Sequence, residues 1–262
     1  MKECERLRQT VCRTVIAGAL PHLLYKTVVD DESQQKIKEI RKKRAENKDL
    51  SLVVYSNHIA VVDPLFAGNI AFRMDRKGTL KFVAPMSYSN TEDKPENKKT
   101  ILLTKFIDMC GVETHRVIQK YQINSDEYGF SDSMASQINM PFLLRLRNLS
   151  KEKTPTCIIV FPEGHRTDGA LIEGDEAMYR AGSLLAPVLF VPLGIRYEGD
   201  VEKNKLNTGK RVNLTIGDIY LQEKRTDSQM NYESLMVRLA RTLPENMRGF
   251  YKDLAKMPGI RK

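Results

Sequence analysis

His58 and Asp63 stand five positions apart, on either side of the apolar residues 59–62. A turn between them can fold the carboxylate back onto the imidazole, which fixes the tautomer of the ring and leaves its other nitrogen free to take a proton from a hydroxyl. The same residues also fit a structural role, because an aspartate before Pro64 is an ordinary helix N-cap and a histidine can hydrogen-bond at a strand end. The spacing therefore predicts a general base with its orienting carboxylate, with a helix cap as the alternative.

A second polar turn lies about a hundred residues further along, at residues 161–167. Arg166 offers a planar fork suited to a phosphate, and Gly164 allows a ligand to approach the backbone closely. Glu163 projects from the same turn, so a structural turn closed by a Glu163–Arg166 ion pair is the alternative.

The elements that must position these residues follow from the apolar pattern. We expect strands at residues 51–55, 80–84, 112–118, 157–161, 188–195 and 212–220. We expect helices at residues 63–74, 100–110, 133–149, 175–185 and 232–243, the third of them kinked or restarted at Pro141. Strands that alternate with helices predict an α/β sheet covered on both faces, with ligands bound beyond the strand ends. Both polar turns directly follow a predicted strand, so both are candidate site residues.

Composition and charge narrow the class of protein. With 262 residues, of which 41% are hydrophobic and 29% charged, the chain is long enough for a large core and is neither collagenous nor largely disordered. The net charge of +9 favours anionic partners, which include phosphorylated substrates, an acidic carrier protein, an anionic membrane surface and nucleic acid. No nucleic-acid motif and no basic stripe interleaved with aromatic residues accompanies the charge, so we expect no nucleic-acid partner.

The cysteines and histidines predict neither disulfides nor a metal site. Cys4, Cys12, Cys110 and Cys157 lack metal-ligand spacing and are expected to be reduced thiols in a cytoplasmic protein. A zinc site at His58 would need His115 and His165 as further ligands, but no cysteine or acidic cluster supports such a site. We therefore expect these two histidines to line the site or the core.

Residues 1–49 are predicted to form a helical segment ahead of a domain over residues 50–262. The apolar residues 14–25 are too short a run to span a bilayer, and Glu3 and Glu5 argue against a secretory signal. Apolar side chains at positions 12, 16, 20, 23 and 24 fall near one helical face, with arginines close by. Such a helix either lies in a membrane interface or packs on its own domain.

Taken together, three motifs resemble the glycerolipid acyltransferase family, which includes glycerol-3-phosphate and lysophosphatidate acyltransferases. They are Asn57-His58-x4-Asp63-Pro64, Phe161-Pro162-Glu163-Gly164-x-Arg166 and the run from Val191 to Ile195. Their order and placement agree with the family over residues 50–220. The resemblance implies an α/β fold of the glycerol-3-phosphate acyltransferase kind, with a mixed, mostly parallel central sheet covered by helices on both faces.

By this resemblance His58 is the base, Asp63 orients it, and the activated hydroxyl attacks the thioester of acyl-CoA or acyl carrier protein directly. Those two molecules are co-substrates, and no cofactor is implied. Glu163, Gly164 and Arg166 are expected to bind the phosphate of the acceptor or to shape the site, and Gly164 also to help stabilise the developing oxyanion.

Three features of the sequence depart from the family's pattern, and one of them is the wholly apolar x4 segment at residues 59–62. The block Gly111-Val112-Glu113-Thr114-His115-Arg116 matches the family only loosely, so Arg116 is either a phosphate ligand or a surface arginine at a strand end. His165 stands where the family usually has Thr or Ser, which bears on the acceptor more than on the reaction.

The resulting hypothesis is an acyltransferase of phospholipid biosynthesis that acylates a hydroxyl of lysophosphatidate. Glycerol 3-phosphate or another lysolipid is the alternative acceptor. A peripheral protein on the cytoplasmic, anionic membrane surface follows from the charge and from the N-terminal segment. A different class of protein, a basic binding module without catalysis, is the rival hypothesis. The sequence leaves open the length of the acyl chain, the choice of donor and the oligomeric state.

Overall fold

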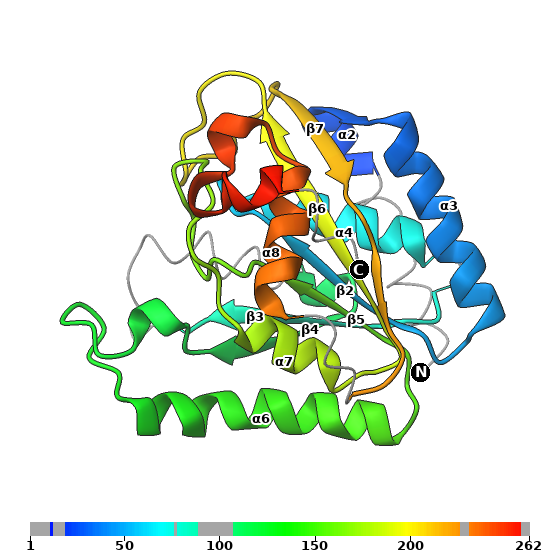
Figure 1. Cartoon of the computed structure of the whole chain (residues 1–262), viewed down its shortest axis with the longest axis vertical. Coiled ribbons are helices and arrows are strands. Elements are labelled where there is room, and N and C mark those ends of the chain that lie inside the picture. The colour runs from blue at the N-terminus through cyan, green and yellow to red at the C-terminus, as the bar shows by residue number, and fades with distance from the viewer. Residues whose placement is uncertain (1–10, 13–18, 76–77, 89–106, 226–230, 258–262) are drawn as a thin grey trace.

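The computed structural model describes residues 11–12, 19–75, 78–88, 107–225 and 231–257, and it has one central sheet with helices on both sides (Figure 1). The strands are β1 (Lys26–Val29), β2 (Ser51–Ser56), β3 (Lys81–Ser87), β4 (Val112–Val117), β5 (Thr156–Val160), β6 (Val188–Tyr197), β7 (Arg211–Ile216) and β8 (Tyr220–Gln222). The main helices are α2 (Leu20–Leu24), α3 (Asp31–Glu46), α4 (Asp63–Met74), α6 (Asp132–Lys151), α7 (Ala177–Ser183) and α8 (Tyr232–Arg241). Short 3₁₀ turns follow β4 at Lys120–Gln122 and follow α8 at Glu245–Met247, Gly249–Tyr251 and Leu254–Lys256.

The sheet is mixed and mostly parallel. Its strand order is β1-β7-β6-β2-β5-β3-β4, and β8 pairs with β6 outside this path. The five strands from β6 to β4 run parallel to one another, whereas β7 and β8 run antiparallel to β6. The predicted α/β fold with a mixed, mostly parallel sheet is therefore confirmed. One edge of the sheet carries the carboxyl ends of all five parallel strands.

The central strand β2 explains why helices cover both faces. All six of its residues are buried, as expected for a strand between two helical layers. Leu52 and Val54 belong to the apolar cluster that contains residues of α3 and α4, whereas Val53 and Tyr55 belong to the cluster formed with α6, α7 and α8. Because successive side chains of a strand point to opposite faces, one short apolar run anchors both layers.

The predicted elements correspond closely to the observed ones, with two local differences. The helix expected at residues 133–149 does not restart at Pro141, since α6 continues through this residue as one helix. The strand expected at residues 212–220 is divided into β7 and β8, which both pair with β6. Of the helix expected at residues 100–110, only residues 107–110 fall within the described part of the chain, and residues 107–109 are helical.

The N-terminal segment is not wholly helical. Residues 26–29 form β1, which pairs in parallel with β7 and so belongs to the central sheet, and the prediction of a helix is wrong there. The strand has only four residues, which is too short for the alternation of a strand to stand out. Much of the proposed membrane-interface helix lies at residues 1–10 and 13–18, outside the described residues, and the boundary at residue 49 stays a prediction.

Across the described residues, no helix combines the length and the apolar character needed to cross a bilayer. Cys12, Cys110 and Cys157 are buried free thiols, as the sequence predicted, and Cys4 lies outside the described residues.

Candidate active site

The sheet brings the two polar turns together. β2 and β5 are neighbouring parallel strands, with Tyr55 paired to Val160, so the residues that follow each strand emerge side by side at the same edge. The amide N–H of Thr167 donates to the carbonyl of His58 over 2.8 Å, which joins the turns directly. Motifs about a hundred residues apart in the sequence therefore form one site.

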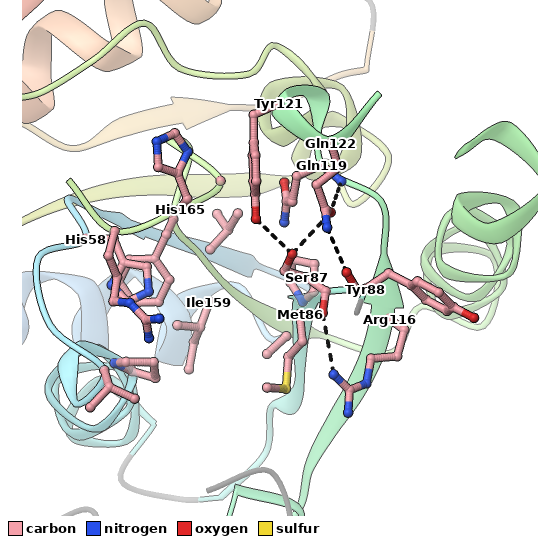
Figure 2. A pocket seen from close by; sticks show the side chains of 18 of the residues that line it. His58, Met86, Ser87, Tyr88, Arg116, Gln119, Tyr121, Gln122, Ile159 and His165 are labelled. Atoms are coloured by element: carbon pink, nitrogen blue, oxygen red, sulfur yellow. Dashed lines mark hydrogen bonds between the residues drawn. The ribbon is translucent and has the colours of Figure 1, made fainter. Parts of the chain in front are cut away.

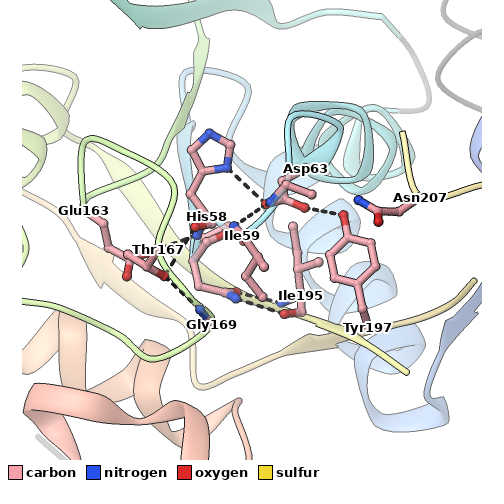
Figure 3. A network of polar contacts seen from close by, with 12 residues as sticks. His58, Ile59, Asp63, Glu163, Thr167, Gly169, Ile195, Tyr197 and Asn207 are labelled. Carbon is pink, nitrogen blue, oxygen red and sulfur yellow. Dashed lines mark hydrogen bonds and ion pairs between the residues drawn. The ribbon is translucent and has the colours of Figure 1, made fainter. Parts of the chain in front are cut away.

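His58 and Asp63 form the pair that their spacing predicted (Figure 3). The Nδ1 atom of His58 lies 3.0 Å from Oδ2 of Asp63. The ring of His58 stacks on Phe161, the first residue after β5, with 4.3 Å between the ring centroids. Contacts with a carboxylate on one edge and an aromatic face on one side fix the orientation of the imidazole, and Nε2 is the nitrogen left for a reacting proton.

Asp63 accepts hydrogen bonds from the turn before α4, and it is not the N-cap of this helix. Val62 is the N-cap of α4, and Asp63 is the first residue of the helix. The carboxylate is fully buried, and its Oδ2 atom accepts the amide N–H groups of Ile59 at 2.6 Å and Ala60 at 2.8 Å. These two bonds curl residues 59–62 around the carboxylate and bring His58 back onto it. The predicted N-cap role is thus wrong, and the predicted base–orienter geometry is present.

Tyr197, at the end of β6, completes the surroundings of Asp63. Its hydroxyl donates to Oδ1 of Asp63 over 2.5 Å, on the carboxylate oxygen that His58 does not contact. Burial raises the pKa of Tyr197 above its ordinary value, and the charge of Asp63 raises it further, so the phenol stays protonated and remains a donor. Sequence reasoning missed this residue, because 134 positions separate it from Asp63 and no local motif joins them.

Asn57 connects the segment that carries His58 to the sheet. Its side-chain amide donates to the carbonyl of Ile195 at 2.9 Å, and its side-chain oxygen accepts the N–H of Ile195 at 2.8 Å. Asn57 is buried, so these two bonds satisfy polar groups that water cannot reach. The residue next to His58 is thereby fixed to β6, the strand that carries Tyr197.

Glu163 supports the backbone of the site. The residue is only 5% exposed, and its two side-chain oxygens accept the N–H of His58 at 2.8 Å and the N–H of Ile172 at 3.3 Å. Burial raises the pKa of Glu163 to about 8, and the charge of Asp63 adds to this, whereas the two backbone hydrogen bonds oppose it. Two roles were predicted for Glu163, binding the phosphate of the acceptor and shaping the site, and these contacts fit the second.

The raised pKa of Glu163 predicts that stability depends on pH. The pKa rises from an ordinary value of 4.5 to about 8 on folding, so protonation favours the folded chain. The contribution is complete below about pH 4.5 and is lost as the pH rises through about 8. We expect the free energy of unfolding of the native chain to fall between about pH 5 and pH 8, relative to that of Glu163→Gln, which does not titrate.

Urea unfolding at several pH values measures this difference. Glu173→Gln is the matched control, because Glu173 is an exposed carboxylate in the same loop. A stability difference between the native chain and Glu163→Gln that stays constant across the window would contradict the prediction.

A pocket of about 330 Å³ opens beside His58 (Figure 2). Gly164, His165 and Arg166 line it from the turn after β5, and Arg116 lines it from β4. Across the pocket from His58 lie the uncharged polar side chains of Ser87, Gln119, Tyr121 and Gln122, with Arg116 on the same side (Figure 2). A volume of this size is at the lower end of the range for small-molecule sites, and a few convergent polar groups are typical of them.

Four of the six predicted site residues line this pocket: His58, Gly164, Arg166 and Arg116. Asp63 and Glu163 lie behind it, each holding a different part of His58. Gly164 has a φ of +76°, in the region that favours glycine, and its N–H donates to the carbonyl of Phe161 at 3.0 Å. That donor is therefore engaged within the turn, contrary to the expectation that it helps stabilise an oxyanion.

His165 lines the site, as one of the two alternatives predicted. Burial lowers the pKa of its imidazole, which favours the neutral ring, and the ring of Tyr121 lies 4.7 Å away. His115 instead bonds to Glu113, with 2.8 Å between Nε2 and Oε1, in an ion-pair cluster with Lys81 and Arg145. Within the described ranges, no three His, Cys, Asp or Glu side chains gather in a way that could hold a metal ion.

The chain was compared with family models, curated proteins and solved structures. No family model matches the sequence, and no curated protein matches it. The chain is similar to the crystal structure of the 1-acyl-sn-glycerophosphate (LPA) acyltransferase PlsC from Thermotoga maritima, with 17% sequence identity over 84% of this chain and 88% of that one, and a TM-score of 0.35.

Proposed function

We propose that the chain transfers a fatty acyl group from acyl-CoA or acyl carrier protein to a hydroxyl of lysophosphatidate, in phospholipid biosynthesis. The observation that carries this proposal is the buried His58–Asp63 pair at the wall of a pocket that also contains Arg116 and Arg166. An oriented base in the same pocket as two arginines, whose guanidinium groups suit a phosphate, matches an acceptor that has both a hydroxyl and a phosphate.

His58 acts as the general base in this reaction. With the Nδ1 proton donated to Asp63, Nε2 takes the proton of the acceptor hydroxyl while the hydroxyl oxygen attacks the thioester carbonyl carbon. The carbon–sulfur bond then breaks, and the thiolate takes the proton back from the imidazolium. The products are the ester and the free thiol, and His58 returns to its starting state. A thioester is already activated, so the reaction needs no covalent acyl-enzyme.

Two arginines bind the negatively charged phosphate of the acceptor. Arg166 and Arg116 approach the pocket from the turn after β5 and from β4. Arg116 donates to the carbonyl of Ser87 at 3.4 Å, a long contact that a phosphate oxygen can replace. The polar residues opposite His58 supply hydrogen bonds to the glycerol backbone.

The partners of the proposal follow from charge and substrate chemistry. A net charge of +9 suits the phosphates of CoA, an acidic carrier protein and an anionic membrane surface. No cofactor is needed beyond the acyl donor. A peripheral protein on the cytoplasmic side of the membrane would meet both the donor and the lysolipid.

The experiment measures free thiol released from long-chain acyl-CoA or acyl carrier protein by the full chain. Lysophosphatidate, glycerol 3-phosphate and lysophosphatidylcholine are compared as acceptors. Release that depends on lysophosphatidate supports the proposal, and release with only one of the others assigns that acceptor in its place. Absence of acceptor-dependent release with either donor would overturn the acyltransferase and favour a binding module.

Arg166→Ala should weaken binding of the phosphorylated acceptor. A hydrogen bond to a charged group contributes roughly 1.5–3 kcal/mol, so we expect the KM for lysophosphatidate to rise about tenfold to a hundredfold with a smaller change in kcat. Steady-state kinetics at varied acceptor concentration measures both constants. Arg180→Ala is the matched control, since Arg180 is an exposed arginine on α7 that pairs with Glu176. A fall in kcat at unchanged KM would remove Arg166 from acceptor binding.

A further inference from the structure

The carboxylate of Asp63 divides its contacts between its two oxygens (Figure 3). Oδ2 faces His58 and the amides of Ile59 and Ala60, whereas Oδ1 receives the hydroxyl of Tyr197. With these four partners at 2.5–3.0 Å, the buried carboxylate is held on both sides.

Tyr197 is itself fixed by rigid elements. The residue is 8% exposed, and its ring meets Phe66 of α4 edge to face, with 6.1 Å between the ring centroids. Phe66 in turn meets the ring of Tyr25 at 5.0 Å. Two residues earlier on β6, Ile195 is held by the two hydrogen bonds of Asn57. The position of the hydroxyl is therefore set by β6, by the residue that follows β2 and by α4 together.

We propose that Tyr197 is a positioning residue for the His58–Asp63 pair, acting through its hydrogen bond to Oδ1 of Asp63. This inference rests on the proposed role of His58 as base. The bond fixes the plane of the carboxylate and thus the ring of His58. It also draws negative charge away from Oδ2, which loosens the hold of the carboxylate on a protonated imidazole.

Other ionisable groups also surround the pair. Glu163, His165 and Arg166 come from the turn after β5, Lys203 from the loop after β6 and Tyr25 from the residue before β1. A Tyr197→Phe substitution removes one hydroxyl and changes none of these charges. A change in the titration of His58 in this variant therefore reports the lost bond.

The first test is an NMR titration of the histidine rings in the full chain. The chain has four histidines, and the signal that His58→Ala lacks identifies His58. In Tyr197→Phe we expect the midpoint of the His58 titration to rise by about half a pH unit, because the carboxylate holds the imidazolium more tightly. Tyr55→Phe is the matched control: its buried hydroxyl donates to the carbonyl of Leu235 at 3.1 Å on the opposite face of the sheet, and its loss should leave the midpoint unchanged.

The second test is kinetic. Tyr197→Phe should lower kcat about tenfold at neutral pH, leave the KM for the acceptor near its native value, and move the acid limb of the pH profile upward. A native midpoint and a native pH profile in a folded Tyr197→Phe protein would overturn the proposal and leave Tyr197 as a packing residue.

A second variant covers the case in which Tyr197→Phe does not fold. A fluorotyrosine placed at position 197 keeps the bond and makes its donor more acidic, so the His58 midpoint should move downward. An unchanged midpoint would overturn the proposal. Because the NMR titration needs no substrate, it separates a failure of this inference from a failure of the proposed acyl transfer.

Discussion

Replacing His58 with alanine should lower the rate of acyl transfer by about a thousandfold, because general base catalysis typically contributes 10²–10⁴-fold. The variant loses the ring that Asp63 orients and that Phe161 supports, while the backbone bonds at this position remain possible. The measurement is acceptor-dependent release of free thiol from acyl-CoA. Binding of the acceptor should change little, since the two arginines of the pocket are untouched.

His22→Ala is the control for this result. His22 is an exposed histidine on α2, so its loss removes an imidazole without altering the pocket. A His58→Ala protein that folds and retains a rate within about tenfold of the native chain would remove His58 as the base. Salt-sensitive binding of anionic ligands that survives in such a variant, without turnover, would instead support the binding-module hypothesis.

The parts of the fold that could be predicted are those with a local signal. The wholly buried β2 appears in the sequence as an unbroken apolar run, and α4 begins at the Asp63-Pro64 pair as expected. β1 has no such signal, because its four residues are only partly buried and gain their place by pairing with β7. The continuity of α6 through Pro141 was also unpredictable, since the residues that pack along the helix determine whether it stops.

The site residues that could be predicted are likewise those with a local signal in the sequence. His58 and Asp63 could be predicted because one turn joins them, and Gly164 and Arg166 because they follow a strand. Tyr197 comes from a strand 134 residues away, so only the sheet brings it to Asp63. The motif that contains Glu163 could be recognised, but the direction of its side chains could not be predicted. The carboxylate of Glu163 points toward the backbone of His58, whereas Arg166 lines the pocket.

Asp63→Asn should lower kcat about a thousandfold while leaving the fold nearly intact, by analogy with the loss of the orienting carboxylate in a catalytic triad. The side-chain oxygen of asparagine can accept the amides of Ile59 and Ala60 in place of Oδ2, and its NH₂ group can donate to the oxygen of Tyr197. What is lost is the negative charge beside Nδ1 of His58, which stabilises the imidazolium that forms during the reaction. Thiol release measures kcat, and urea unfolding measures stability.

Asp63→Ala separates the chemical role of this residue from its structural one. It leaves the amides of Ile59 and Ala60 and the hydroxyl of Tyr197 without their acceptor in a buried place, and each such loss costs roughly 1–3 kcal/mol. The three losses together, roughly 3–9 kcal/mol, are a large share of the stability of an ordinary domain. We therefore expect Asp63→Ala to unfold at much lower urea than Asp63→Asn, although both lose activity. Equal stability of the two variants would mean that the turn at residues 59–62 does not depend on the carboxylate, and a near-native rate in Asp63→Asn would mean that its charge does not serve the base.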